Sequence, residues 1–477
     1  MLLLERRSLS SIKIFNHHIS FPVALLALVE ATICYLSLFA ASSIRFYGQG
    51  GLAYAHGEVF SLPASSALVA ALVVLIMLAM GLYQAQRREV IWNVLNRITT
   101  AFIVVSLVLS IIFFMFPEMY FGRGLFVLTL FISFVGIVFA RLIFASWVDK
   151  HKLNRKVLIL GVGEKAGWVD NLRRRSDRRG ITIAGFYGLD SESRSVDEKS
   201  VIATDLPLDE YVLQNGIDEI VVAMTERRQT FPTKELINCR LSGVDVIELP
   251  TFLERQMSRV YIELLDPSWI IFSDGFRQNG LKAMSTRAFD IFASLFMLLL
   301  TMPLLIGSII AIFIESRGKG TIFYKQTRVG QNNKSFELLK FRSMCENAEA
   351  GTGAQWAVQN DSRVTRVGRI LRKYRIDELP QLLNILKGEM SLVGPRPERP
   401  EFVGQLSEKI PFYSERHRVK PGLAGWAQMR YQYGSTENDA IEKLKYDLYY
   451  VKNSSLIFNL AILVQTAEIV LWGKGAR

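Results

Sequence analysis

Four long apolar runs dominate the first third of the chain. They extend over Phe21 to Ile44, Leu62 to Tyr83, Ile98 to Phe116 and Leu125 to Trp147. Each is about as long as the ~20 residues that a helix needs to cross the hydrocarbon core of a membrane. The first run is too long for the apolar part of a cleaved signal peptide, and three further runs follow it. The pattern predicts a four-helix transmembrane bundle within residues 1–150.

A different pattern begins at Arg155, where short apolar runs alternate with polar helical ones. KVLIL, ITIAGFYG, IDEIVVAM and VDVIELP are predicted strands, with helices near 209–214 and 232–242. Such alternation is typical of a parallel sheet covered by helices. We therefore expect a Rossmann-like α/β domain over residues 151–280.

The first turn of this domain contains a glycine fingerprint. Gly161, Gly163 and Ala166 fit the pattern G-x-G-x-x-A, and Asp190 follows at roughly the distance of a ribose-binding acid. A match of this kind alone is weak evidence for a nucleotide. A domain that keeps the fold for regulation or assembly also needs the tight turn, and we favour that interpretation.

A fifth long apolar run, from Arg287 to Ile314, opens the last domain, which we expect over residues 281–477. Lysines and arginines flank it on both sides, which predicts that both of its ends lie in the cytoplasm. Pro303, near its middle, removes a helix hydrogen bond and offers a place to bend. We predict a re-entrant helix that enters one leaflet, breaks at Pro303 and returns, with Arg287 and Asp290 at its mouth near the lipid headgroups. A fifth spanning helix is the alternative.

Lysine and arginine also gather at alternate ends of the first four runs. The flanks that carry them hold Arg6, Arg7, Lys13, Arg87, Arg88, Arg97, Lys150, Lys152, Arg155 and Lys156. The two other loops carry only Arg45 and Arg123. Because cytoplasmic loops are rich in cations, the N-terminus and everything after Lys150 are expected in the cytoplasm. Within the runs, we expect Arg141 to reach the cytoplasmic headgroups and Glu30 to face a neighbouring helix.

Composition supports a membrane protein that meets anions. The 477 residues carry a formal charge of +12, and half of them are hydrophobic. This balance favours an anionic substrate or anionic lipid over a soluble nucleic-acid binder, and no nucleic-acid-binding motif is present. The three cysteines have no metal-ligand spacing, and they predict neither a zinc site nor a disulfide framework.

The stretch from Arg372 to Glu398 combines two adjacent carboxylates with many cations. Pro380 is tolerated only in the first turn of a helix, so a helix is predicted from Asp377, as its N-cap, to about Lys387. Gly388 would end it in the left-handed conformation. The positive helix end and nearby arginines are expected to keep Asp377 and Glu378 ionised and to attract anions. A capping Asp beside a solvated Glu is the common alternative for such a pair.

The cations around this stretch recur among turns and strand-like residues, which favours a concave anion site. The candidates for substrate binding are Lys340, Arg342, Arg363 and Arg372, together with the turn Pro395-Arg396-Pro397. Two prolines stiffen that turn, so that Arg396 is presented to a phosphate or nucleoside at little entropic cost. The last apolar segment, about 456–472, contains polar residues and is predicted to be an interfacial helix.

The series KFRSM, DSRVTRVGRILRK, DELPQLLNILKGEMSLVGPRPE and KPGLAGWAQ, after a proline-broken membrane helix, resembles the bacterial sugar transferase family of polyprenyl-phosphate phosphoglycosyl transferases. The resemblance covers residues 286–477. Four spans and a Rossmann-like domain in front are similar to the long members that begin exopolysaccharide, capsule or O-antigen synthesis. The family commonly has Ser-Pro at the helix break, where this chain has Met302-Pro303 and therefore lacks the serine hydroxyl that could form a hydrogen bond there.

The resemblance implies a function. Asp377 would be the nucleophile and Glu378 its partner, with Mg²⁺ at the pair. A UDP-sugar would give its sugar 1-phosphate, most simply glucose 1-phosphate, to undecaprenyl phosphate with release of UMP. Relatives of this kind suggest a homodimer at the cytoplasmic face of the bacterial inner membrane.

Three alternatives remain open at this level. Direct in-line transfer would leave Asp377 only holding the metal. A membrane-anchored nucleotide-sugar dehydratase or epimerase could share the front half, but no tyrosine here is followed four residues later by lysine. A non-enzymatic scaffold for polysaccharide export would leave the dense motifs after residue 340 unexplained.

Overall fold

The computed structural model describes residues 11–14, 17–47, 62–83, 91–147, 155–172, 180–188, 195–225, 231–265, 280–345, 363–431, 434 and 436–471. The chain divides into two compact units, residues 1–257 and 258–477.

The predicted apolar runs of the first unit are helices. They form α2 (Phe21–Arg45), α3 (Leu62–Ala79), α4 (Ile91–Met115) and α5 (Arg123–Trp147), after a short hairpin of β1 (Ser11–Ile14) and β2 (His17–Ser20). Helix α2 packs against α3 and α5, and α4 packs against both of those helices. All four are long and apolar enough to cross a membrane, and many of their apolar side chains face outward. These helices indicate a membrane protein.

A buried ion pair lies inside this bundle. Arg141 Nε is 2.7 Å from Glu30 Oε1, and the Tyr83 hydroxyl donates a hydrogen bond to Glu30 at 2.5 Å. Glu30 is fully buried, as expected for a side chain that faces its neighbours. The expectation that Arg141 reaches toward the headgroups is wrong, because its guanidinium pairs with Glu30 between the helices.

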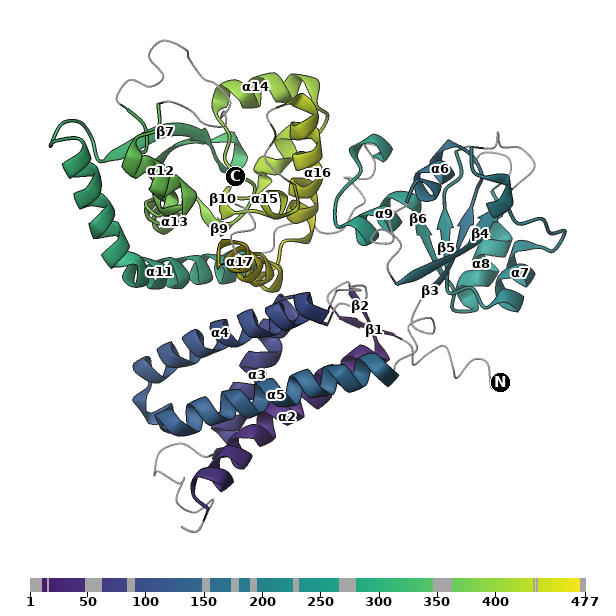
Figure 1. Cartoon of the computed structure of the whole chain (residues 1–477). Coiled ribbons are helices and arrows are strands. Elements are labelled where there is room, and N and C mark those ends of the chain that lie inside the picture. The colour runs from purple at the N-terminus through teal and green to yellow at the C-terminus, as the bar shows by residue number, and fades with distance from the viewer. Residues whose placement is uncertain are drawn as a thin grey trace. The chain divides into compact units, whose positions relative to one another are not determined.

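The α/β domain has the predicted parallel sheet. Its strands are β3 (Arg155–Leu160), β4 (Ile181–Tyr187), β5 (Glu219–Val222) and β6 (Asp245–Glu248), in the order β4-β3-β5-β6. The connecting helices are α6 (Glu164–Asp170), α7 (Leu208–Asn215), α8 (Thr233–Leu241) and α9 (Leu249–Met257) (Figure 1). The central strands end in apolar, buried runs, 157–160 in β3 and 220–222 in β5, because helices cover both faces of such a sheet.

Close packing explains the glycine at the first turn. Gly161 has a φ of +121°, and a Cβ there would lie 2.9 Å from the carbonyl oxygen of Ala223. The Ser195 N–H also donates to the carbonyl of Val162 in this turn. The turn therefore requires Gly161 whether or not a nucleotide binds. Asp190 lies outside the described residues.

The second unit surrounds a small parallel pair of strands, β9 (Ser391–Val393) and β10 (Gly422–Ala424). The other elements are α11 (Gly280–Glu315), β7 (Phe323–Val329), β8 (Ser335–Phe341), α12 (Arg366–Lys373), α13 (Gln381–Lys387), α14 (Pro400–Lys409), α15 (Trp426–Arg430), α16 (Glu437–Asn453) and α17 (Leu456–Leu471). Val260 and Ile262 belong to the core of this unit, so its packing begins well before residue 281, where we expected the domain to start. Helix α17 also contributes to that core, with Ile462 fully buried.

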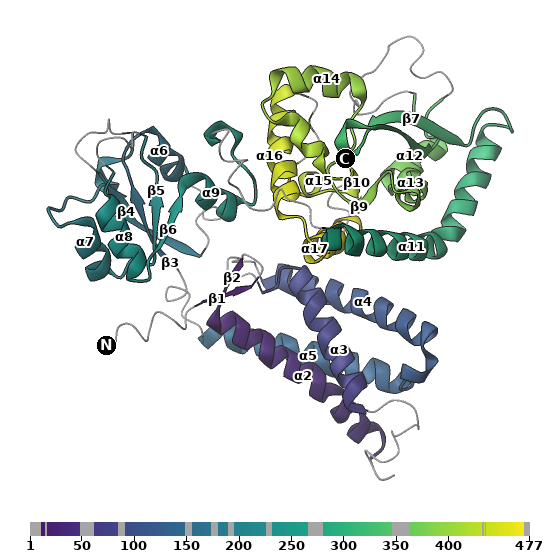
Figure 2. The ribbon, with the colours of Figure 1, turned by 180° about the vertical axis from the view of Figure 1, so that it is seen from behind.

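Helix α11 is a single helix of 36 residues with Pro303 inside it, and the helix is bent. Figures 1 and 2 show two arms that meet at an angle, with α12 and α13 in the space between them. On the first arm, Arg287 donates to the carbonyls of Ile385 and Leu386 at the end of α13. At the other end, Glu315 accepts a hydrogen bond from the Val367 N–H of α12. Both ends of α11 are therefore bound to the same unit.

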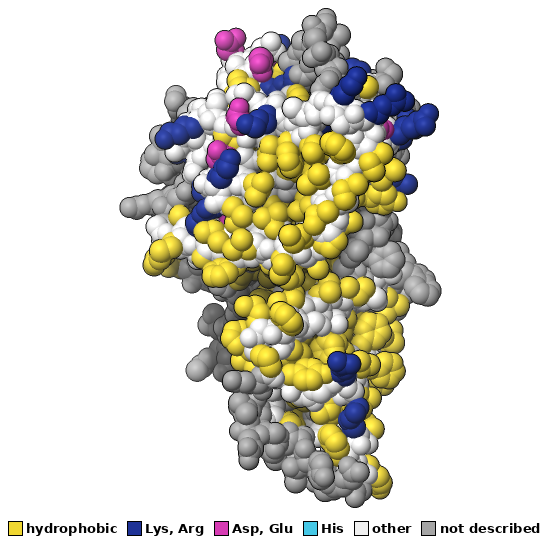
Figure 3. Space-filling view, turned by 90° about the vertical axis from the view of Figure 1, so that its left-hand side faces the viewer, with side chains coloured by type: hydrophobic (Ala, Val, Ile, Leu, Met, Phe, Trp, Pro, Cys, Tyr) yellow, Lys and Arg dark blue, Asp and Glu magenta, His cyan; other side chains and the backbone are white. Residues whose placement is uncertain are grey.

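The outer side of α11 is strongly apolar. Exposed side chains on it include Phe292 at 75%, Leu299 at 71% and Ile314 at 68%. In the upper part of Figure 3, hydrophobic side chains form a broad surface bordered above by lysines and arginines. Exposed apolar surfaces of this extent mark contacts with lipid or protein.

Candidate active site

The two carboxylates lie in a short 3₁₀ helix, η6 (Ile376–Glu378), between α12 and α13. The prediction that Asp377 caps the following helix is wrong, because α13 begins at Gln381 and Pro380 occupies the cap position. Arg375 adopts a left-handed φ of 58° that separates η6 from α12. The other end was predicted correctly, since Gly388 has a φ of 89° just after Lys387.

Local packing fixes this segment against β8. The Asn384 side chain accepts from the Leu339 N–H at 3.0 Å and donates to the Glu337 carbonyl at 2.7 Å. This side chain binds α13 to the backbone of β8 just before Lys340. On the other side, α12 begins so close to the end of β8 that a Cβ on Gly368 would lie 2.1 Å from the Ser343 carbonyl oxygen.

Glu378 is held by three cations from three segments. Its Oε1 accepts hydrogen bonds from Lys340 Nζ at 3.1 Å and from Arg396 Nη2 at 2.9 Å, and Arg375 lies 3.8 Å from Oε2. Burial alone would raise the pKa of Glu378, but Lys340, Arg396 and Arg375 hold this pKa well below its usual range. Glu378 is therefore ionised at neutral pH, as predicted.

Asp377 has the opposite environment. It is only 8% exposed, and it makes no hydrogen bond or ion pair with any residue that the structure describes. Burial and then the Glu378 charge raise the pKa of Asp377 above its usual range, against the effect of Lys340, Arg372 and Arg396. The expectation that the helix end and arginines simply keep Asp377 ionised is therefore incomplete. A buried carboxylate without partners, near three cations, is available to attack an electrophile or to bind a metal.

The turn that carries Arg396 is also fixed as predicted for a double-proline turn. Pro395 and Pro397 are buried, while the Arg396 side chain keeps 29% of its surface exposed and reaches Glu378. The Arg396 guanidinium is therefore partly exposed beside the Glu378 carboxylate.

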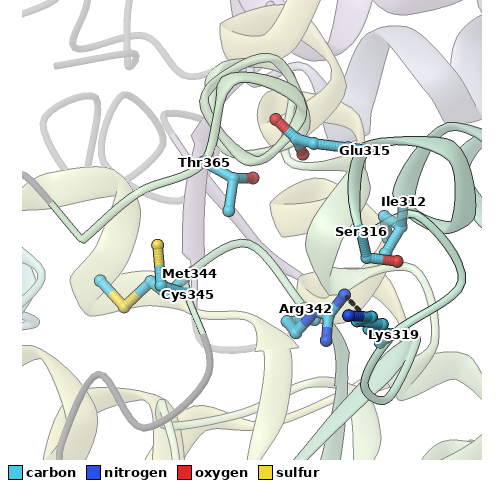
Figure 4. A pocket seen from close by; sticks show the side chains of 8 residues that line it. All are labelled: Ile312, Glu315, Ser316, Lys319, Arg342, Met344, Cys345 and Thr365. Carbon is cyan, nitrogen blue, oxygen red and sulfur yellow. Dashed lines mark hydrogen bonds between the residues drawn. The ribbon is translucent and has the colours of Figure 1, made fainter.

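Two of the other predicted cations, Arg342 and Arg363, have contacts with other segments. Arg342 donates to the Lys319 carbonyl and lines a pocket of about 210 Å³ between the end of α11 and Thr365 (Figure 4). The backbone carbonyl of Arg363 accepts a hydrogen bond from the Cys345 N–H. Substrate contacts by these two arginines stay predictions.

The first arm of α11 carries Arg287 and Asp290, which both contact other elements of the second unit. Asp290 is 2% exposed and accepts hydrogen bonds from the Ser391 hydroxyl and the Leu392 N–H. It therefore anchors α11 to β9, and its level relative to the lipid headgroups stays a prediction. Arg287 caps the end of α13.

Sequence reasoning missed the groups behind the Pro-Arg-Pro turn, which are Arg328, Arg416 and Asp447. Asp447 lies in α16 between Leu444 and Leu448, both fully buried. A carboxylate on the apolar face of a helix is a signal that could have identified it. Its partner, Arg416, lies in a distant segment, so the pairing could not be predicted from the sequence.

Divalent metal binding fits this site only with help from a substrate. No group of three or more His, Cys, Asp or Glu side chains suited to a metal occurs among the described residues. Asp377 has free oxygens, and Glu378 is adjacent. Mg²⁺ commonly takes one or two carboxylates and completes its shell with phosphate oxygens and water, so this pair suits it.

Two family models and several known proteins match this chain. Residues 281–473 match the family model described as bacterial sugar transferase, and residues 78–248 match one described as CoA-binding domain. The chain is 41% identical, over 51% of its length, to a UDP-N-acetylgalactosamine-undecaprenyl-phosphate N-acetylgalactosaminephosphotransferase of Aeromonas hydrophila. It is 31% identical, over 68% of its length, to an undecaprenyl-phosphate glucose phosphotransferase of Komagataeibacter xylinus. These matches span 56% and 61% of the two relatives.

A shorter relative matches almost completely. The exopolysaccharide production protein PSS of Rhizobium leguminosarum bv. phaseoli is 43% identical over 40% of this chain and 96% of its own length.

Proposed function

The chain belongs to the bacterial sugar transferase family, and on this premise we propose that it transfers a sugar 1-phosphate from a UDP-sugar to undecaprenyl phosphate, releasing UMP. The observation that carries the proposal is the contrast between the two carboxylates. Asp377 is buried and has no hydrogen-bond or ion-pair partner among the described residues, while Glu378 pairs with Lys340 and Arg396. This arrangement suits phosphoryl transfer, in which positioning and charge neutralisation supply most of the catalysis.

The proposed reaction has two steps. An Asp377 oxygen attacks the sugar-bearing phosphorus of the UDP-sugar, and the bond from that phosphorus to UMP breaks, so UMP leaves with the electron pair. A phosphate oxygen of undecaprenyl phosphate then attacks the same phosphorus. This second attack releases the Asp377 carboxylate and gives undecaprenyl diphosphate sugar, with no net proton transfer.

The cations have assigned roles in this proposal. Lys340, Arg372 and Arg396 neutralise the diphosphate, and Arg396 can leave Glu378 in part to do so. Asp377, Glu378 and the diphosphate oxygens would hold Mg²⁺, which supplies further neutralisation of charge when bound. Glu378 keeps Lys340 and Arg396 oriented toward the reacting group.

We propose glucose as the sugar because the Komagataeibacter relative is named a glucose phosphotransferase. The Aeromonas relative acts on an N-acetylhexosamine by its name, so the sugar has to be measured. No residue here is tied to a particular sugar hydroxyl.

The proposed setting is the cytoplasmic face of the bacterial inner membrane, with α11 re-entrant. A straight helix of its 36 residues would be about 54 Å long, more than the ~30 Å of a hydrocarbon core. Its bend, and the attachment of both ends to one unit, support a helix that returns to the side it came from. Its exposed apolar surface would then lie in one leaflet, beneath Asp377.

The test is release of UMP by the purified full chain with Mg²⁺ and undecaprenyl phosphate, using UDP-glucose, UDP-galactose and UDP-N-acetylgalactosamine in turn. We expect UMP with UDP-glucose, none with Asp377→Asn, and unchanged turnover with Glu408→Gln, an exposed carboxylate on α14. No UMP from any of the three sugars would contradict the proposal.

A second measurement distinguishes two-step from direct transfer. Incubation with UDP-glucose but no lipid should leave a phosphosugar on Asp377, visible by intact-mass analysis. Normal turnover with no adduct at any time would instead favour direct transfer.

A further inference from the structure

In the Pro395-Arg396-Pro397 turn and the residue after it, four consecutive backbone carbonyls each accept a hydrogen bond from another segment. Prolines at 395 and 397 have no N–H to contribute to a ladder of their own. The donors to Pro395, Arg396, Pro397 and Glu398 are, in order, the Gly422 N–H at 2.9 Å, Arg416 Nη2 at 2.9 Å, Arg328 Nη1 at 3.0 Å and the Val329 N–H at 2.9 Å. The position of this turn is therefore determined by distant residues.

Arg416 is the most enclosed of these donors. Its side chain is 6% exposed, and it forms an ion pair of 2.8 Å with Asp447, which is 3% exposed. The same nitrogen, Nη2, donates to the carbonyl of Arg396, and Nη1 donates to the Tyr413 hydroxyl at 2.8 Å. Burial raises the pKa of Asp447 to about 6, although Arg416 lowers it, so both groups are charged at neutral pH.

Stability alone is a weak reason for such a pair. Moving two charges out of water costs several kcal/mol, and apolar side chains of similar volume often replace a buried pair without loss. Arg416 also keeps a buried Nε without a hydrogen-bond partner among the described residues. An apolar pair could not hold the Arg396 carbonyl in place. The planar guanidinium of Arg416 does so, because its Nη2 contacts both that carbonyl and Asp447.

We propose that Arg416 and Asp447 are positioning residues that act through the backbone of Arg396 on its guanidinium. The contacts form a continuous chain: Asp447 orients Arg416, Arg416 fixes the Arg396 carbonyl, and Arg396 reaches Glu378 Oε1 at 2.9 Å. The inference rests on the proposed function, in which Arg396 neutralises the diphosphate. A shift of about 1 Å in such a group costs on the order of 100-fold in rate.

The expected effect is a loss of catalysis without a matching loss of folding. Asp447→Asn removes the charge that orients Arg416. Arg416→Lys keeps a positive charge for Asp447 but loses the planar guanidinium and its several N–H donors. Each should lower kcat/KM for the UDP-sugar by roughly 10- to 100-fold. Glu437→Gln, which breaks the exposed Lys409–Glu437 pair of the same unit, is the matched control and should leave turnover unchanged.

A double-mutant cycle separates positioning from general damage. If Asp447 works through Arg396, Asp447→Asn should change kcat/KM less than twofold once Arg396 is already alanine. Equal losses in both backgrounds would overturn the proposal, and so would full activity of Asp447→Asn. Arg416→Lys is measured in the same cycle, so the test stands if one variant fails to fold.

Hydrogen–deuterium exchange gives a readout that does not depend on turnover. Peptides covering residues 391–402 should exchange faster in Asp447→Asn and Arg416→Lys than in Glu437→Gln. Unchanged exchange there would contradict the positioning role even if the protein acts on a different substrate. Faster exchange without UMP release by the unmodified protein would instead contradict only the proposed function.

Discussion

Asp377 and Glu378 are neighbours in the chain and equally buried, yet only Glu378 has ion-pair partners among the described residues. Its carboxylate accepts hydrogen bonds from Lys340 and Arg396, while that of Asp377 makes none. The pKa of Glu378 is consequently held low, and burial raises the pKa of Asp377. One turn of 3₁₀ helix thus provides both a fixed negative charge and a reactive carboxylate.

The pH dependence of turnover should report Asp377. An aspartate must lose its proton to attack phosphorus, so kcat/KM should rise with pH through the pKa of Asp377, which burial and Glu378 raise. The acid limb should therefore lie above the usual aspartate range. Initial rates of UMP release from pH 4.5 to 8 would measure it, with buffer controls for stability.

Arg372→Gln should move that limb to higher pH, because the Arg372 charge lowers the pKa of Asp377. Arg366→Gln, an exposed arginine of the same helix, should not move it. An acid limb that stays in place in Arg372→Gln would contradict this account of the site.

The two carboxylates should respond with opposite sign to neutralisation. At pH 7 the ionised form of Asp377 is disfavoured in the folded protein, so Asp377→Asn should leave stability unchanged or raise it. Glu378→Gln removes a charge that folding favours and leaves Lys340 and Arg396 without their partner, costing about 2 kcal/mol in part-exposed surroundings. Thermal unfolding in detergent at pH 7 would compare them, and a shift of the same sign in both would be inconsistent with the structure.

The limits of prediction in this site follow from sequence distance. Gly388 was predicted correctly because a left-handed glycine after a helix is a local requirement. The start of this helix was predicted wrongly. Proline is tolerated at the N-cap as well as in the first turn, and nothing in the local sequence indicates that Arg375 adopts a left-handed conformation. The two hydrogen-bond partners of Glu378, Lys340 and Arg396, lie 38 and 18 residues away, so their convergence depends on the fold.

The larger elements could be predicted from pattern alone. Apolar length identified α2 to α5 and α11, and alternation identified the strands of the sheet. The side-chain pairings between these elements could not be predicted in the same way. The pairing of Glu30 with Arg141 spans 111 residues, and neither residue type names its partner.

Pro303 should determine which side of the membrane the last unit occupies. Pro303→Leu restores a helix hydrogen bond and favours a straight helix long enough to cross. In a background with the three native cysteines replaced by serine, cysteines at positions 282 and 319 should both be labelled from the cytoplasmic side. With Pro303→Leu, part of the population should label from opposite sides at the two positions.

Met302→Leu is the control for that experiment, because it changes the adjacent exposed side chain but not the backbone. It should keep both positions on one side and keep UMP release. Opposite labelling in the protein that retains Pro303 would contradict the re-entrant arrangement.

The ion pair in the bundle should matter most when only one partner is removed. Glu30→Gln leaves the Arg141 guanidinium, 13% exposed, without its anion between apolar helices, and about 3 kcal/mol of stability should be lost. Arg141→Met should cost a similar amount because Glu30 is fully buried. The double variant Glu30→Gln with Arg141→Met should recover much of the loss, because no unpaired charge remains. Arg123→Gln, an exposed arginine at the start of the same α5, is the control. Thermal unfolding of the full chain in detergent measures the cycle, and strictly additive losses would mean that the two charges do not interact in the membrane bundle.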